Sequence, residues 1–469
     1  MMDIGLSVME MIGLAVLVCG AGIAIINMLQ LVTAFWTLSR RSPPLTSQEN
    51  WQRFSDFAPT ISLIVPAYNE AETIVSSVGA LLAIEYPDFE VIVVNDGSKD
   101  DTIARLVDAF DLEAAPIPEQ GSLRHKILTN AFSSPTFMRL LVLDKVNGGK
   151  ADALNAGINL ARGKFVCVID ADSILDRDAL LRASRSFIEH PGEVVAIGGS
   201  IRLTNGCNIS ASDILEIAPP LKYLPLMQTL EYLRTFHLSR TAMSAAGALT
   251  LISGAFGLFS KDLLLAIGGY THDTVGEDYE LGMRLHRHLR DTGQHKAKII
   301  YLPDAVCWTQ APESFAVLGR QRSRWQRGAM ETLWRHRDMI ANPRYGRIAA
   351  LSMFEAVLTD ILTPITEFMG FILIPIFILI GALSPDYFIA FVSISVGLGI
   401  AQSTGAILVE EMRFRRFPKT EHILVLLLAA IIENFGYRQL CSWWRIKGFI
   451  EFLQGKKQWG TMTRQKLST

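Results

Sequence analysis

The sequence predicts a doubly wound, Rossmann-like α/β domain with membrane helices before and after it in the chain. Three observations predict this fold class. Half of the 469 residues are apolar and 19% are charged, so part of the apolar surface must face something other than water. Long uncharged runs lie near both ends. Between them, over 59–317, short β-branched runs alternate with helical stretches, which is typical of a parallel sheet with crossover helices.

The overall charge and the cysteines exclude several classes of protein. The chain has 44 basic and 46 acidic residues, so it lacks the positive charge of a nucleic-acid binder, and we expect no nucleic-acid partner. Its five cysteines are scattered and form no CxxC pair. We therefore interpret them as packing residues rather than as a disulfide framework or a zinc site.

Residues 1–40 are predicted to form a transmembrane anchor. The stretch 11–39 contains no charged side chain and is longer than the roughly 20 residues that cross a bilayer. Acidic rather than basic residues precede it, which argues against a cleaved signal peptide. Arg40 and Arg41 follow it, so the positive-inside rule predicts that the next domain is cytoplasmic.

A second membrane region is predicted over 346–445. The uncharged runs 368–385 and 387–409 are separated by a Ser-Pro-Asp turn and indicate a transmembrane hairpin. The following loop and the tail 446–469 are basic, so we expect both in the cytoplasm and an even number of crossings in this region.

Two further apolar segments of this region carry charges and allow two interpretations. The segment 348–366 contains Glu355 and Asp360, and the segment 423–440 contains Glu433 and Arg438. Either both segments cross and the charges line a channel, or both lie in the interface and the charges snorkel to water.

In the α/β domain, five short apolar runs predict strands and four amphipathic stretches predict helices. The expected strands are 61–65, 89–95, 139–143, 165–169 and 194–198, and the expected helices are 72–83, 101–109, 150–161 and 178–189. Polar residues follow three of the strands, including Glu70, Asp96 and the pair Asp170 and Asp172. Ligands of doubly wound sheets bind at the carboxyl ends of the strands, so these side chains should meet in one crevice.

The spacing of Asp170 and Asp172 at a strand exit suits a hard divalent cation, Mg²⁺ or Mn²⁺, bound to a diphosphate. Helix capping is the alternative for this pair. Lys150 follows two glycines at the start of a helix and could contact a phosphate, or could be an ordinary surface lysine. No P-loop or dinucleotide fingerprint accompanies these residues.

Further along the chain, Glu277 and Asp278 could supply a carboxylate that deprotonates an acceptor hydroxyl. An amphipathic interface helix is expected over 318–345. On it, Gln321, Arg324 and Trp325 could present a hydrogen-bonding fork and an aromatic plate to a sugar, or could anchor the helix among lipid headgroups. The histidines at 286 and 288 are two apart on a helix and cannot face one ligand, so both are expected at the surface.

Together these motifs resemble a known family. The ordered set of Asp96, the Asp-Ala-Asp of 170–172, Asp278 and the Gln-x-x-Arg-Trp of 321–325, flanked by membrane helices, resembles the membrane-embedded family 2 glycosyltransferases. This group includes poly-N-acetylglucosamine, cellulose and hyaluronan synthases, and the first of these is nearest in layout. The resemblance runs from residue 59 to the tail.

The resemblance implies a GT-A fold with a mixed sheet, which binds a UDP-sugar and inverts the anomeric centre. On the donor side, Asp96 would contact the nucleoside, Lys150 and Asp170 the UDP region, and Asp172 the metal, while Glu70 matches a donor-site position. On the acceptor side, Asp278 would be the general base. The remaining acceptor and UDP contacts that the resemblance implies are Gly254, Glu277, Gln321, Arg324 and Trp325.

Three functions remain open on the sequence. The leading hypothesis is a processive β-glycosyltransferase of the plasma membrane that extends a polysaccharide and feeds it across the bilayer. The alternative is a single-transfer enzyme with a lipid acceptor, resembling ceramide glucosyltransferase. A third is a subunit that binds nucleotide without catalysis. The chain has one N-terminal helix where several relatives have two, so an export or accessory subunit could complete a channel. The sugar and the linkage are not encoded in these motifs.

Overall fold

The computed structural model describes residues 2–119, 121–210 and 213–456, so residues 457–469 of the predicted tail lie outside it. The chain divides into two compact units. The first, which we name the sheet unit, comprises Ser42–Ala218 and Gly247–Ala311. The second, the helical unit, comprises the described parts of Met1–Arg41, Pro219–Ala246 and Pro312–Gly460.

The sheet unit is built on a mixed sheet that has ten strands in the described residues, in the order β3-β4-β5-β2-β1-β6-β11-β8-β12-β7. Its strands are β1 (Ile61–Ala67), β2 (Phe89–Asn95), β3 (Glu113–Ala115), β4 (Leu128–Ser133), β5 (Leu140–Lys145), β6 (Phe165–Ile169), β7 (Ile174–Leu175), β8 (Val194–Leu203), β11 (Phe256–Ser260) and β12 (Lys298–Thr309). A separate two-stranded ribbon pairs β9 (Asn208–Ser210) with β10 (Asp213–Glu216). All five predicted strands are present, as β1, β2, β5, β6 and β8, and the predicted fold class is confirmed.

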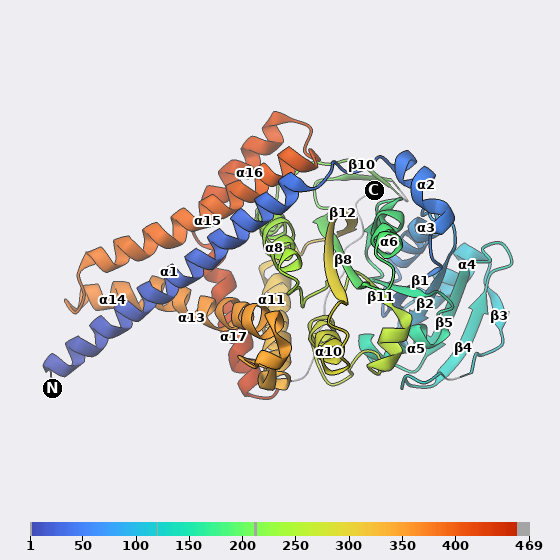
Figure 1. Ribbon diagram of the computed structural model, residues 1–469, viewed down its shortest axis with the longest axis horizontal. Helices are drawn as coiled ribbons and strands as arrows, with labels where there is room; N and C mark the ends of the chain where they lie inside the picture. The colour runs from blue at the N-terminus through green and yellow to red at the C-terminus, as the bar shows by residue number, and fades with distance from the viewer. Residues whose placement is uncertain (1, 120, 211–212, 457–469) are drawn as a thin grey trace. The chain divides into compact units, whose positions relative to one another are not determined.

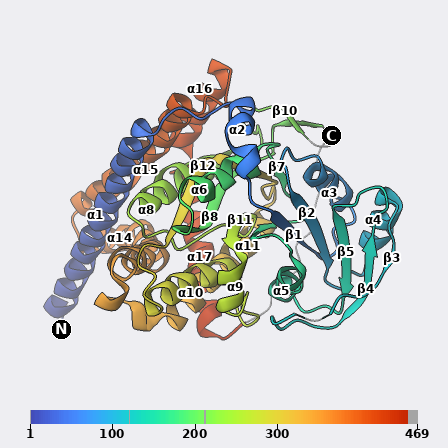
Figure 2. The ribbon, with the colours of Figure 1, turned by 45° about the vertical axis from the view of Figure 1, so that its right-hand side comes forward.

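The centre of this sheet is parallel, and helices cover it (Figures 1 and 2). Strands β5, β2, β1 and β6 pair in parallel and are almost entirely buried, as their continuous apolar runs require. The helices of the unit are α2 (Ser47–Phe54), α3 (Ile74–Leu82), α4 (Thr102–Phe110), α5 (Lys150–Leu160), α6 (Ala179–Glu189), α9 (Lys261–Ala266) and α10 (Glu277–Asp291). Helix α5 packs closely on β1. A Cβ at Gly157 would lie only 2.5 Å from Cγ2 of Ile64, which shows how close the helix and the strand are.

The register of the parallel strands brings their carboxyl ends to one edge of the sheet. Ala67 at the end of β1 pairs with Asn95 at the end of β2, and Asn95 pairs with Asp144 near the end of β5. Strand β6 pairs with the other side of β1 and ends at Ile169. The polar residues that follow these strands therefore start from the same edge.

The helical unit contains the long apolar helices. It comprises α1 (Met2–Arg40), α7 (Tyr223–Leu233), η2 (Arg234–Arg240), α8 (Thr241–Ala245), α11 (Phe315–Arg335), η3 (Arg337–Met339), η4 (Pro343–Tyr345), a helical run from η5 to α14 (Ile348–Leu379), α15 (Pro385–Arg413), α16 (Thr420–Ile432) and α17 (Tyr437–Leu453). In the described part of the chain, three helices are long and apolar enough to cross a membrane: Met9–Arg40, Ile348–Leu379 and Pro385–Arg413. The chain is therefore a membrane protein. In Figure 1, α1 runs beside α15, and the two are in contact.

The predicted C-terminal hairpin is present, but the predicted bounds of its first helix are wrong. The helical run begins at Ile348 and ends at Leu379, so the charged segment 348–366 and the uncharged run after it are one helix, and 380–384 is a turn. The charged residues do not end this helix, since other helices supply hydrogen-bond partners for them. Asp360 accepts from Arg445 at 3.0 Å, and Glu355 accepts from Gln30 at 3.2 Å. The segment 423–440 is also divided, between α16 and α17, which form an angle of 59°.

Candidate functional site

The aspartate that follows β2 is buried and organises the loop before α5. Asp96 is 3% exposed, and its carboxylate accepts the backbone N–H groups of Gly148 at 2.9 Å and Gly149 at 2.7 Å. The Nζ of Lys145 donates to the same carboxylate at 2.5 Å. Burial raises the pKa of Asp96, while Lys145 and the two amides act against that rise. Asp96 thus holds a glycine-rich loop at the edge where the strands end.

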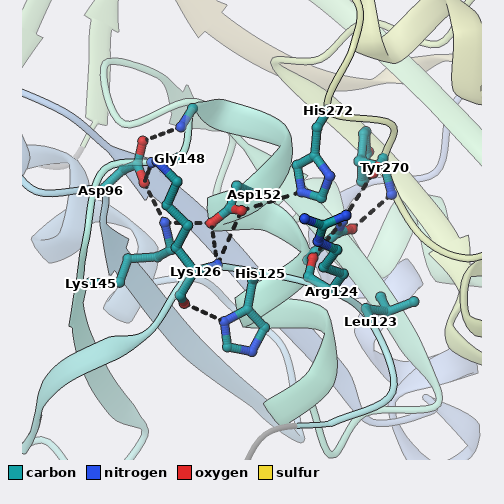
Figure 3. Close-up of polar contacts among 12 residues, drawn as sticks. Asp96, Leu123, Arg124, His125, Lys126, Lys145, Gly148, Asp152, Tyr270 and His272 are labelled. Carbon is teal, nitrogen blue, oxygen red and sulfur yellow. Dashed lines mark hydrogen bonds and ion pairs between the residues drawn. The ribbon is translucent and has the colours of Figure 1, made fainter.

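Lys145 extends this cluster to α5, as Figure 3 shows. Its Nζ lies 2.5 Å from Asp96 and 2.5 Å from Oδ1 of Asp152, and its side chain is fully buried. Asp152 in turn accepts the backbone N–H of Lys126 at 3.0 Å and lies 3.4 Å from Nε2 of His272. Neither Lys145 nor Asp152 was predicted from the sequence. Lys145 ends β5, so the strand-end argument used for the neighbouring strands would have included it.

A second cluster forms around Lys150, the first residue of α5. Its Nζ lies 2.5 Å from Oδ1 of Asp170 and 3.6 Å from Oε1 of Glu277, and it donates to the carbonyl oxygen of Gly254 at 3.5 Å. Burial lowers the pKa of this lysine, but Asp170 and Glu277 outweigh burial and raise the pKa above its usual value. Lys150 is therefore a permanent cation between two carboxylates. This one side chain therefore contacts three residues that are distant from one another in the sequence.

The loop that carries Gly254 also contacts Asp278, in the first turn of α10. Oδ2 of Asp278 accepts the backbone N–H of Gly254 at 3.2 Å, and Oδ1 accepts the N–H of Tyr279 at 2.8 Å. Each carboxylate oxygen has a further lone pair, so the group can still accept a proton from a substrate hydroxyl. A Cβ at Gly254 would lie 3.0 Å from Nζ of Lys150 and 3.4 Å from Asp278. Glycine therefore allows the loop to approach both groups.

Two other donor-side residues that the sequence predicted lie near the ends of β1 and β6. Glu70 is 4% exposed, and its carboxylate accepts from the hydroxyl of Thr73 at 3.0 Å. Asp172 is half-buried in the turn between β6 and β7.

The residues at the end of β6 fit a cation that is shared with a ligand. Among the described residues, no group of three or more His, Cys, Asp or Glu side chains is placed to hold a metal ion on its own. Asp170 and Asp172 both supply carboxylate oxygens at this end of the sheet, and Asp170 also pairs with Lys150. Mg²⁺ sites of this kind use one or two carboxylates and complete the shell with substrate phosphates and water, so this donor set suits a nucleotide-bound ion.

The predicted sugar-facing motif lies in the helical unit, on α11. Gln321 and Arg324 are half-buried, and Trp325 is 41% exposed. The expected interface helix ends at Arg335 rather than at 345. The short 3-10 turns η3 and η4 follow it. Not every arginine of this helix is available to anchor it among lipid headgroups. Arg322 is 4% exposed and pairs with Glu231 at 2.8 Å.

The prediction that His286 lies at the surface is wrong. The side chain is 6% exposed on α10, and its Nε2 donates to the backbone carbonyl of Leu249 at 2.7 Å. Burial lowers the pKa of His286 to about 4. The imidazole is therefore a neutral packing group, and its partner could not be inferred from helical spacing. The five cysteines are free, as expected.

Comparison with known protein families gives two matches. Residues 58–328, more than half of the chain, match the family described as glycosyltransferase like family 2. Residues 274–465 match the chitin synthase family over a smaller part of the chain. The first match includes every predicted site residue, from Glu70 to Trp325.

Two relatives and one solved structure are similar to this chain. The poly-beta-1,6-N-acetyl-D-glucosamine synthase of Staphylococcus epidermidis is 32% identical over 275 residues, which cover 59% of this chain and 56% of that one. The synthase of the same name from Staphylococcus aureus strain COL is 31% identical over 300 residues, or 64% and 61% of the two chains. A mannosyltransferase from Pyrobaculum calidifontis, solved with GDP-Man and Mn²⁺, superposes with a TM-score of 0.55 at 18% identity, covering 96% and 99%. That likeness confirms the GT-A fold.

Proposed function

Because this chain belongs to glycosyltransferase family 2, we propose that it transfers N-acetylglucosamine from UDP-N-acetylglucosamine to the end of a growing polysaccharide. The observation that carries the proposal is the cluster around Lys150, in which Asp170, Glu277 and the loop at Gly254 meet one cation. The loop also holds the carboxylate of Asp278. The donor is taken from the two synthases, whose similarity covers little more than half of their length.

The chemistry that we propose is a single inverting displacement. Asp278 accepts the proton of the acceptor hydroxyl, the acceptor oxygen forms a bond to C1 of the sugar, and the bond from C1 to the β-phosphate oxygen of UDP breaks. Asp96 contacts the nucleoside, with Glu70 near it, and Lys150 and Asp170 lie along the diphosphate. Gly254 and Glu277 border the acceptor side. The resemblance to the family also assigns contacts with UDP and the acceptor end to Gln321, Arg324 and Trp325.

A divalent cation, Mg²⁺ or Mn²⁺, fits this proposal as a partner of Asp172. When bound, the ion neutralises the charge that develops on the departing diphosphate. The solved mannosyltransferase of the same fold holds Mn²⁺, which supports the choice of ions. We expect Asp172→Ala to abolish turnover at every concentration of either ion. Full activity of the wild-type protein in EDTA would contradict this role.

For the membrane topology, we propose several crossings with the sheet unit on the cytoplasmic side, where UDP-sugars are made. The basic residues after α1 and after α15 support this orientation. The polymer would leave through the helical unit, alone or with an export or accessory subunit. A cysteine introduced in the exposed part of the sheet unit should be labelled by an impermeant reagent only in inverted vesicles.

The decisive test measures UDP release by the purified protein with a panel of UDP-sugars, followed by sizing of the product. We expect UDP-N-acetylglucosamine to be the best donor and the product to be a polymer. A product of one sugar on a lipid would replace our proposal with the single-transfer alternative, and no UDP release from any donor would indicate a subunit without catalysis.

The proposed base has a matched control on the same helix. Asp278→Asn should lower kcat by about 10²-fold or more while UDP still binds, because the amide cannot accept the proton. Asp291→Asn, at the other end of α10, should keep normal turnover. Equal turnover of the two variants would remove Asp278 from the role of base.

A further inference from the structure

Helix α5 carries two asparagines, one turn apart, whose side-chain amides each make a pair of hydrogen bonds with the backbone of one distant residue. Oδ1 of Asn155 accepts the N–H of Tyr270 at 2.7 Å, and its Nδ2 donates to the carbonyl oxygen of Tyr270 at 2.9 Å. Asn159 makes the same pair of bonds with Leu123, at 2.9 and 2.8 Å. Both ends of each amide are used, so each pair of bonds fixes the position of one backbone unit. Nδ2 of Asn155 also donates to the carbonyl oxygen of Arg124, at the longer distance of 3.4 Å. Figure 3 shows the two bound residues, Tyr270 and Leu123, beside the Lys145 cluster.

The backbone that Asn155 binds belongs to a loop that is tied to α10. The hydroxyl of Thr271 donates to Oε2 of Glu280 at 2.9 Å. The guanidinium of Arg284 donates to the carbonyl oxygens of Ile267 at 2.6 Å and Gly269 at 2.7 Å. Glu280 and Arg284 are both on α10 and pair with each other at 2.9 Å. The loop 267–271 and helix α10 are thus held together as one piece.

The sequence accommodates close contact at this point. Gly269 has a φ of +68°, which non-glycine residues rarely adopt. A Cβ on this residue would lie 2.3 Å from Oδ1 of Asn155, well inside contact distance. Asn155 itself is 1% exposed, so water does not replace its hydrogen bonds. The clamp between α5 and the loop therefore depends on both residues.

Helix α5 consequently contacts the α10 piece at two places. At its first residue, Nζ of Lys150 is 3.6 Å from Glu277 and 2.5 Å from Asp170. One and a half turns later, Asn155 holds the loop that precedes α10. These two contacts, together with Asp152 of α5, which lies 3.4 Å from His272 between the loop and α10, set the distance between the donor carboxylates and the first turn of α10.

We infer that Asn155 is a positioning residue for Asp278, which it places against the donor without touching the substrate. The inference rests on the role proposed for Asp278. Loss of the clamp would let the α10 piece move relative to α5, and a displacement of about 1 Å can cost up to about 10²-fold in rate. The donor would still bind, because Asp96, Lys145 and Lys150 keep their own contacts.

Asn159 provides a matched control, since it makes an equivalent clamp on the same helix to a segment that does not lead to α10. We expect Asn155→Ala to lower kcat at least about tenfold with the KM for UDP-N-acetylglucosamine within about threefold of wild type. Asn159→Ala should keep kcat within about threefold while lowering the unfolding temperature by a similar amount. Equal kcat values for the two variants would overturn the inference.

A second variant tests the clamp without removing it. In Asn155→Asp, the ionised carboxylate still accepts from the N–H of Tyr270 but repels its carbonyl oxygen, whereas the protonated acid donates to that oxygen. The turnover of this variant relative to wild type should therefore rise as the pH falls. The same substitution at Asn159 should give a ratio that does not change with pH, and a flat ratio at Asn155 would count against the clamp.

The role of Asp278 as the base and the positioning role of Asn155 can fail separately. Normal turnover of Asp278→Asn would end the role of Asp278 and the inference with it. If Asp278→Asn is inactive but the Asn155 and Asn159 variants behave alike, the proposed function stands and only the positioning role is overturned. A donor KM that rises in Asn155→Ala with unchanged kcat would also overturn it, because the clamp would then serve donor binding.

Discussion

The site carboxylates of the sheet unit and the carboxylates of the helical unit have different hydrogen-bond partners. In the sheet unit, Asp96 accepts two backbone N–H groups, from Gly148 and Gly149, besides the ammonium of Lys145, and the half-buried Asp278 accepts two more. In the helical unit, the partners are side chains of other helices. Arg234 and Ser403 both donate to Glu433, the latter at 2.5 Å.

Other carboxylates of the helical unit follow the same rule. Nε2 of His237 lies 2.7 Å from Oε2 of Glu410, and both side chains are 1% exposed. Nη2 of Arg438 donates to Glu367 at 2.8 Å. In each case the partner comes from a helix or turn that is distant in sequence.

The difference has a simple physical origin. Strand ends, loops and the first turn of a helix have backbone N–H groups without an internal partner, so a carboxylate can use them. The interior of a long helix offers none, because each N–H already bonds within the helix. A carboxylate at such a helix start, such as Asp278, therefore keeps lone pairs for a substrate, whereas the carboxylates of the helical unit hold helices together.

The largest effect should come from breaking one of these ion pairs between helices. Glu433 is fully buried, so Arg234→Met leaves a buried carboxylate without its cation and should cost about 3–5 kcal/mol of stability. We expect the unfolding temperature in detergent to fall by roughly 10 °C. The double variant Arg234→Met/Glu433→Leu should recover most of the loss, since no charge is then left unpaired.

The control for this prediction is an exposed ion pair of the sheet unit. Lys298 and Glu193 are 2.8 Å apart with side chains about half exposed. Lys298→Met should leave the unfolding temperature almost unchanged, because exposed ion pairs contribute little to stability. If it and Arg234→Met lower the unfolding temperature equally, the distinction between the two units does not hold.

The same distinction explains what could be predicted from the sequence. Strand ends are visible as apolar runs followed by polar residues, so Asp96 and Asp170 could be assigned to one edge before the structure was seen. The partners of Glu355 and Asp360 could not, because nothing local in the sequence selects Gln30 or Arg445. Without those partners, the charges suggested a segment boundary that does not exist.

A smaller effect should follow from removing the cation of the Asp96 cluster. Lys145→Met leaves Asp96 and Asp152 buried without their shared ammonium. We expect UDP to bind at least about tenfold more weakly by calorimetry, because Asp96, the carboxylate that we propose as the nucleoside contact, loses its orientation. The exposed Lys99→Met should bind UDP normally. Unchanged UDP affinity in Lys145→Met would mean that Asp96 is held by the two backbone amides alone.

The stability of Lys145→Met should also depend on pH in a known direction. Burial already raises the pKa of Asp96, and without the cation that opposes this rise the pKa lies further above its value in the unfolded chain. Stability is then present at low pH, where Asp96 is protonated, and is lost as the pH rises through the raised value. The difference in unfolding temperature from wild type should therefore shrink as the pH falls. A difference that grows on acidification would contradict this account of the cluster.

The smallest effect concerns His286 in the sheet unit. The hydrogen-bond partner of its imidazole is a backbone group, as are partners of Asp96 and Asp278. Its folded-state pKa of about 4 lies below the ordinary value of about 6.5. The unfolded chain therefore binds more protons between these values, and stability falls as the pH drops through this window, by roughly 1 kcal/mol between pH 7 and 5.5. His286→Gln keeps a donor for the carbonyl of Leu249 and should remove this part of the pH dependence. His288→Gln, on the same helix but half-buried, should leave it unchanged, and an identical pH profile for both variants would mean that another group titrates in this window.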